Sequence, residues 1–127
     1  MAAPNIVNVA TIKGKLGQVE ATTAANGVLL LANPASPGGT IFKVNTIIAA
    51  NIDGVAAADI TIIIFGEDDS SGTELVKICN LVTVPAKASL VILDKNSSIY
   101  LEEDRSIYAK ASANGDIDVL VSYEEIS

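Results

Sequence analysis

The side chains of this sequence that could do chemistry are mainly carboxylates. Acidic residues gather in four places, at Asp53, at residues 67–69, at residues 102–104, and at Glu124 with Glu125. None of these groups has the alternate spacing and closing glutamate of a calcium loop. Paired carboxylates can also cleave glycosides, but that chemistry needs a cleft that stacks sugars, and the chain has no Trp and only three Tyr. We therefore expect no metal site and no catalytic carboxylates.

Nucleophilic chemistry has little support either. The chain has no His, which excludes histidine-based triads, metal ligands and general bases. Ser97 and Ser98 follow Lys95, but a turn rich in Asp, Lys, Asn and Ser explains them without a Ser/Lys pair. Residues 14–17 lack the spacing of a nucleotide-binding loop. The single cysteine, Cys79, lies in an apolar stretch and is expected to behave as a small hydrophobe. We expect no enzyme and no cofactor.

The overall charge and composition limit the partners. The formal net charge is −7, and the eight Lys and Arg residues are scattered singly, which disfavours nucleic acid. The longest apolar runs fall far short of the roughly 20 residues of a membrane span. The first residues lack the charged and apolar regions of a signal peptide. We therefore expect a soluble protein that is made in a cytoplasm.

The elements that must carry these residues follow a period of two. In residues 40–50 the alternation predicts a half-buried strand with two faces, namely Phe42, Val44, Thr46 and Ile48 against Lys43, Asn45 and Ile47. Residues 58–65 are apolar at nearly every position, which predicts a central strand that is covered on both faces. Residues 73–83 follow after a polar turn at residues 67–72 and could pair with that strand as a hairpin.

Further strands are predicted near the C-terminus. Residues 89–93 form a short β-branched run, and residues 98–101 are expected to form a turn or a 3₁₀ piece. Asn114-Gly115 provides the residues of a type I′ turn, so the alternating runs at 107–111 and 117–123 predict an antiparallel hairpin.

The first third of the chain is less regular. Residues 6–12 are strand-like, and Gly14 and Gly17 are expected to interrupt the pattern that follows. A helix is possible over residues 18–25, and residues 33–39 are expected to form a loop. Together these patterns predict an all-β fold, a single antiparallel β-sandwich or jelly-roll-like domain of about eight short strands over residues 1–127. Residues 1–5 are either a frayed tail or an extended arm. An α+β domain is the alternative fold.

Several segments carry a resemblance to a known group of proteins. They are Val84-Pro85-Ala86-Lys87-Ala88-Ser89-Leu90-Val91, Ser98-Ile99-Tyr100-Leu101-Glu102-Glu103-Asp104, Ala111-Ser112-Ala113-Asn114-Gly115, Val121-Ser122-Tyr123-Glu124-Glu125-Ile126, the opening residues 1–7, and the stretches at 42–45 and 51–54. The sequence resembles small virion structural proteins of tailed phages, especially those that infect marine cyanobacteria. It departs from that pattern at Asp104-Arg105, where a Gly-Asp turn is expected.

The resemblance implies a structural role in the virion. The leading hypothesis is a capsid decoration or cement protein that bridges major capsid subunits, with a neck, tail or fibre-base component as the alternative and a carbohydrate-binding module as a third hypothesis. The expected partners are the major capsid protein or other virion proteins and further copies of the chain, for instance in a trimer. Termini and long loops reach neighbours most readily, so the predicted contact residues are Ala2, Ala3, Pro4, Asn5, Ile6, Asn33, Pro34, Pro37, Gly38, Glu124, Glu125, Ile126 and Ser127.

Overall fold

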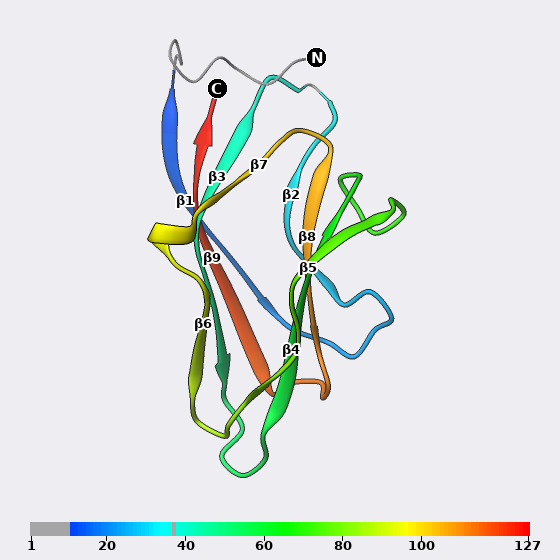
Figure 1. Ribbon diagram of the computed structural model, residues 1–127, viewed down its shortest axis with the longest axis vertical. Helices are drawn as coiled ribbons and strands as arrows, with labels where there is room; N and C mark the ends of the chain where they lie inside the picture. Colours follow the sequence, from blue (N-terminus) through cyan, green and yellow to red (C-terminus); the bar gives the residue numbers. More distant parts are fainter. Residues whose placement is uncertain (1–10, 37) are drawn as a thin grey trace.

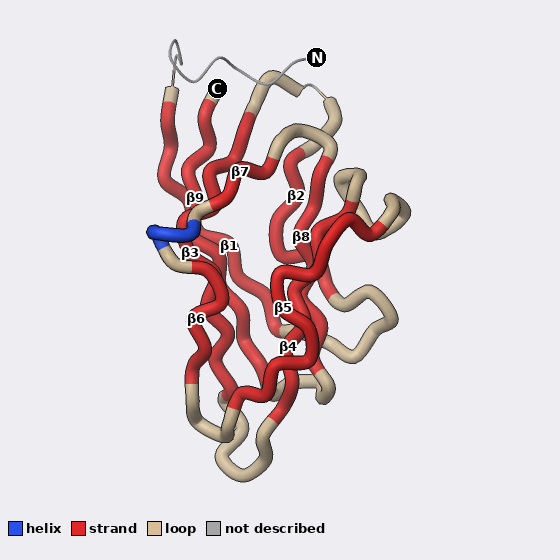
Figure 2. The backbone as a smooth tube through the Cα atoms, in the orientation of Figure 1, coloured by secondary structure: helices blue, strands red, loops and turns tan. Residues whose placement is uncertain are grey.

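Nine strands and one short 3₁₀ helix make up the computed structural model, which describes residues 11–36 and 38–127 (Figure 1). The strands form two facing layers (Figure 2), so the predicted all-β sandwich is confirmed. The elements are β1 (Ile12–Glu20), β2 (Val28–Asn33), β3 (Ile41–Asn51), β4 (Ala58–Phe65), β5 (Glu74–Val84), β6 (Ser89–Leu93), η1 (Lys95–Ser97), β7 (Ile99–Leu101), β8 (Arg105–Ala111) and β9 (Ile117–Ile126).

The strand order is that of a jelly roll. Sheet A has the order β1-β9-β3-β6, with β7 also pairing with β3, and sheet B has the order β2-β8-β4-β5. The paired strands are antiparallel in both sheets, and the chain passes from one sheet to the other at most of its connections. At one side of the sandwich β1 approaches β2, and at the other side β5 approaches β6.

Branched aliphatic side chains fill the space between the sheets. Ile60 and Ile62 of β4, Ile107 of β8 and Val119 and Val121 of β9 are all buried there. Full burial of each such side chain contributes about 1.5–3 kcal/mol. β4 lies between β8 and β5, which confirms the predicted central strand and its hairpin with the strand that follows it.

The outer face of β4 is covered as well. Ile63, Phe65 and Tyr108 form a second cluster there, with the two rings edge to face and their centroids 5.1 Å apart. The connection from β4 to β5 is bonded to this side of sheet B, because the Ser70 amide donates to the Tyr108 hydroxyl at 3.0 Å. The polar turn predicted at residues 67–72 is therefore confirmed and held in place.

A β-bulge in β3 reverses the predicted facing of its second half. The register of β3 with β9 shifts between Val44 and Thr46. As predicted, Val44 is buried in the core, but beyond the bulge it is Ile47 that is buried, whereas Ile48 is only half-buried. The prediction that Ile48 shares the buried face was wrong, because one inserted residue moves every later side chain to the opposite face.

The predicted C-terminal hairpin was also wrong. β8 belongs to sheet B and β9 to sheet A, so the two strands do not pair. A type I′ turn needs two positive φ angles, and only Gly115 of the Asn114-Gly115 pair has one, at 79°. The Asn114 side chain instead accepts a hydrogen bond from the Thr23 amide at 2.9 Å. The apolar faces of both strands are satisfied by the core that the two sheets share.

The start of the described chain is more regular than predicted. β1 pairs with β9 from Ile12 to Glu20 without a register shift, so the predicted interruption at Gly14 and Gly17 was wrong. Residues 18–20 belong to this strand, and not to the helix that was considered possible over residues 18–25. At Gly17 a Cβ atom would lie 2.9 Å from Cγ1 of Val121, which explains why glycine is needed there. Residues 99–101 form β7 against β3 instead of a turn or a 3₁₀ piece.

Two buried asparagines tie the sheets together at strand ends. Nδ2 of Asn51, at the end of β3, donates to the carbonyls of Val84 at 2.9 Å and Ala56 at 3.0 Å. Nδ2 of Asn33, at the end of β2, donates to the carbonyls of Thr40 and Leu101 at 2.9 and 3.0 Å. Each amide therefore satisfies two backbone carbonyls from other segments of the chain, and each joins the two sheets.

Candidate interaction surfaces

Part of the predicted contact set gathers at one end of the sandwich. Thr11 and Ser127 exchange both backbone hydrogen bonds, at 2.9 and 3.0 Å, so the start of β1 is tied to the end of β9. Asn33, Pro34 and Gly38 line a small cavity of about 170 Å³ together with Glu125. The loop after β2 and the C-terminal segment thus meet. The predicted arm, Ala2 to Ile6, and Pro37 lie outside the described residues.

Within this group only some side chains face solvent. Pro34 and Ser127 are exposed, whereas Asn33 is 1% exposed and its amide is used inside the subunit. Ile126 is buried in β9, the strand between β1 and β3.

The two glutamates of the C-terminal segment are also used within sheet A. Glu124 accepts a hydrogen bond from the Asn45 side chain at 3.1 Å, and Glu125 pairs with Lys15. The hydrogen bond and the charge of Glu125 raise the pKa of Lys15 above its ordinary value.

The acidic loops are organised by their own backbone. The carboxylate of Asp53 accepts hydrogen bonds from the amides of Val55 and Ala56, and these bonds lower the pKa of Asp53. The hydroxyl and amide of Ser71 lower the pKa of Asp69 in the same way. Within residues 11–36 and 38–127, no three side chains of the metal-binding types come close enough together to hold an ion.

Cys79 lies on β5 and is half-buried. Its Sγ is 3.7 Å from the carbonyl oxygen of Ile60, and desolvation raises the pKa of the thiol. Because the thiolate is the reactive form, this environment favours an inert side chain.

We expect Cys79 to react slowly with a thiol reagent such as dithionitrobenzoate at pH 7. Burial raises the pKa of this thiol, so the rate should rise only when the pH exceeds the ordinary thiol pKa of about 8.5. The same chain unfolded in guanidinium serves as the control. Equal rates for the folded and unfolded chains at pH 7 would contradict this expectation.

Exposed large apolar side chains lie on the strands at the edges of the two sheets. Outside the loop between β3 and β4, which holds Ile52 and Val55, every exposed large hydrophobic of the described chain is on β1, β2, β5, β6 or β7. They are Ile12, Leu16, Leu29, Leu75, Val76, Leu81, Val82, Val91 and Tyr100. Natural proteins usually protect edge strands with charges or bulges, so exposed apolar side chains at the edges of both sheets are unusual for an isolated domain.

The edge strands β5 and β1 differ in whether they could pair with a further strand. β5 shows three register shifts against β4, and Leu81 has a φ of 52°, so its edge is bent and a poor template for another strand. β1 pairs with β9 in one continuous register and is the outermost strand of sheet A among the described residues. Side-chain contacts therefore suit β5, and β1 could also accept a strand.

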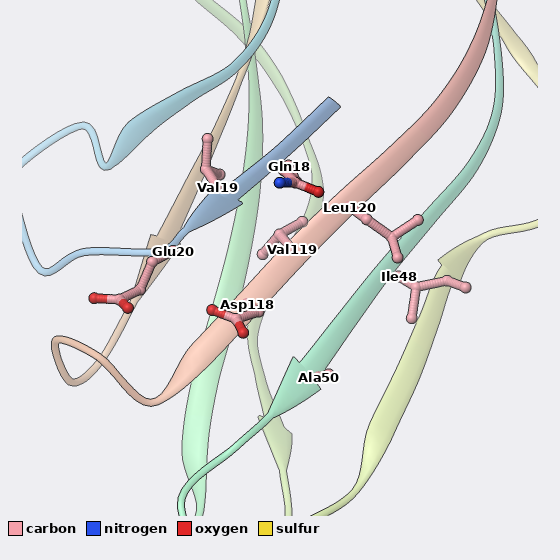
Figure 3. A pocket seen from close by; sticks show the side chains of 8 residues that line it. All are labelled: Gln18, Val19, Glu20, Ile48, Ala50, Asp118, Val119 and Leu120. Atoms are coloured by element: carbon pink, nitrogen blue, oxygen red, sulfur yellow. The ribbon is translucent and has the colours of Figure 1, made fainter. Parts of the chain in front are cut away.

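A hollow lies on sheet A. It has a volume of about 460 Å³, and its lining residues come from β1, β3 and β9 (Figure 3). They are Gln18, Val19, Glu20, Ile48, Ala50, Asp118, Val119 and Leu120. None of these residues was predicted as a contact residue. The alternation of β1 and β9 could have signalled their shared face, but the position of Ile48 depends on the bulge.

Among residues 11–36 and 38–127 there is no helix with the length and apolar character that crossing a membrane requires.

No family model and no curated protein sequence matches the chain. A solved structure does share its fold. It comes from work described as "Bacillus endospore appendages form a novel family of disulfide-linked pili", and the match has a TM-score of 0.50 at 14% sequence identity. The match covers 92% of this chain and 88% of the other. At this identity the likeness establishes a common β-sandwich.

Proposed function

We propose that this chain is a structural subunit of a tailed-phage virion that binds the assembled capsid as a decoration or cement protein. The observation that carries the proposal is the set of apolar side chains along the edge strands on both sides of the sandwich. A subunit with contact surfaces on two sides can bridge two neighbours at once, which is the task of a cement protein. The sequence resemblance to small virion proteins supports the choice of particle.

The structural neighbour supports the structural class only. Its title describes appendages that form disulfide-linked pili, and it gives a precedent for this sandwich in an assembled structure. A chain of subunits joined through disulfides needs at least two cysteines in each subunit. This sequence has one, and Cys79 is half-buried with a raised thiol pKa. Non-covalent contacts are therefore the better proposal for this protein.

Such a subunit acts by mass action. It binds the assembled lattice better than free capsid subunits, so it shifts the equilibrium towards the shell by its differential affinity. Many weakly bound copies act together on one particle. No catalytic step is part of the proposal.

The copy number of the chain in purified particles tests the proposal. We expect quantitative mass spectrometry to find one copy per major capsid subunit, or a simple fraction of that ratio. The major capsid protein in the same sample is the internal standard. About a dozen copies per particle would replace decoration with a neck or tail position, and absence from particles would overturn the virion proposal.

A further inference from the structure

The hollow on sheet A has an apolar floor that continues over β9, β3 and β6. The registers place Gln18, Leu120, Ile48 and Val91 in one row over β1, β9, β3 and β6. Leu16 lies one step away on the same face of β1. Val91 at the β6 end of the row is 57% exposed and Leu16 beside the β1 end is 62% exposed, so apolar side chains meet solvent near both edges of the sheet. An antiparallel sheet face that meets water is normally polar, so this row calls for a covering partner.

Two carboxylates lie at one side of this floor. Glu20 and Asp118 are direct partners in the β1–β9 register. Thr11 and Ser127 exchange hydrogen bonds, and the Ala21 amide bonds to the carbonyl of Ile117, so the alternation makes Glu20 and Asp118 a non-hydrogen-bonded pair. Side chains of such a pair lie especially close together.

This arrangement is unfavourable for the subunit alone. Like charges directly opposite each other on adjacent strands are destabilising. The ion pairs within the described chain join Lys15 to Glu125, Lys77 to Glu74 and Arg105 to Glu102, and none of them includes Glu20 or Asp118. The next residue across the sheet from Asp118 is Ala50, whose small side chain leaves the carboxylates accessible from the hollow (Figure 3).

We propose that this hollow binds a segment of a partner protein in which a lysine or arginine stands among apolar residues. The cationic head would pair with Glu20 and Asp118, and the alkyl stem and its apolar neighbours would cover Leu120 and Ile48. Charge complementarity favours a different protein over a second copy, because each copy carries a net charge of −7. The identification of the partner as another virion protein rests on the proposed function.

A peptide experiment tests the chemistry of the hollow without the particle. The probe is a short peptide in which two lysines alternate with valine and leucine, and its counterpart has glutamate in place of both lysines. We expect the lysine peptide to shift the amide NMR signals of residues 18–20, 48–50 and 118–120, and the glutamate peptide to leave them unchanged. The double variant Glu20→Gln with Asp118→Asn should bind about tenfold more weakly, because two charge-assisted contacts are lost.

The double variant Glu74→Gln with Glu102→Gln is the matched control. It removes the same charge at two exposed positions outside the lining of the hollow, and it should bind as the natural chain does. The proposal is overturned by equal binding of the lysine and glutamate peptides, by unchanged affinity in the Glu20 and Asp118 variant, or by an equal loss of affinity in the control.

A second experiment identifies the partner in purified particles. Carbodiimide joins a carboxylate to a nearby lysine amine as an amide, with loss of water to the reagent. We expect mass spectrometry to find Glu20 or Asp118 joined to a lysine of another virion protein. A crosslink from these residues to a second copy of this chain would overturn the assignment of the partner. Absence of the chain from particles would refute the proposed function, while the peptide result would stand independently.

Discussion

Replacing Ile47 with alanine is expected to lower the free energy of unfolding by about 2–5 kcal/mol, because the change leaves a cavity in the core. The same replacement at Ile48 should cost less than about 1 kcal/mol. Ile47 is 0% exposed, whereas Ile48 is half-buried and lines the hollow on sheet A. The two residues are adjacent and chemically identical, so the difference measures the effect of the β-bulge on which side chain enters the core.

Urea unfolding followed by circular dichroism measures both variants against the natural chain. The bulge predicts a large shift of the midpoint for Ile47→Ala and a small shift for Ile48→Ala, with the same slope. A larger shift for Ile48→Ala would show that β3 keeps an uninterrupted alternation, and equal shifts would contradict the difference in burial between the two residues.

Replacing Asn51 with alanine is the second large effect, with an expected loss of about 3 kcal/mol. The change removes the amide that satisfies the carbonyls of Ala56 and Val84 and the oxygen that accepts from the Asp53 amide at 2.9 Å. A buried polar group left without a partner costs about 1–3 kcal/mol. Asn51 is 2% exposed, so water cannot easily replace the lost bonds.

Asn80→Ala provides the control for that measurement. Asn80 lies exposed on β5, and its replacement should change the free energy of unfolding by less than about 0.5 kcal/mol. If Asn51→Ala were as mild as Asn80→Ala in the same urea experiment, the connection between the ends of β3 and β5 would not depend on the Asn51 side chain.

The strands that the sequence predicts best are those whose turn residues enclose a continuous apolar run. β4 begins and ends where residues 58–65 were predicted, and its pairing with β5 follows from the short polar turn between them. It is harder to predict which side chains of a strand face the core. A single inserted residue, such as the one in β3, cannot be recognised from the alternation of apolar and polar residues. The Asn114-Gly115 turn shows a related difficulty. A tight turn with an apolar face on each flank suits both a hairpin and a crossing between sheets.

The residues of the candidate surface could not be predicted from residue type, because the strand register brings them together. Glu20 and Asp118 are far apart in the chain, and the residues around each of them form no motif that indicates a binding site. They become a pair only because β1 and β9, the first and last described strands, lie side by side. The exposed edge residues have the same origin. Leu75 and Val82 are typical of a buried strand, and only the position of β5 at the edge of sheet B leaves them in solvent.

The position of β9 between β1 and β3 also has a consequence for biosynthesis. Neither of its neighbours in sheet A can reach its final pairing until Ile117–Ile126 has left the ribosome. At synthesis rates of about 5–20 residues per second, the nascent chain carries unpaired strand edges for several seconds. Sheet A is therefore completed only after its last strand has been synthesised, and the edges of β1 and β3 that face β9 stay open to wrong pairing until then.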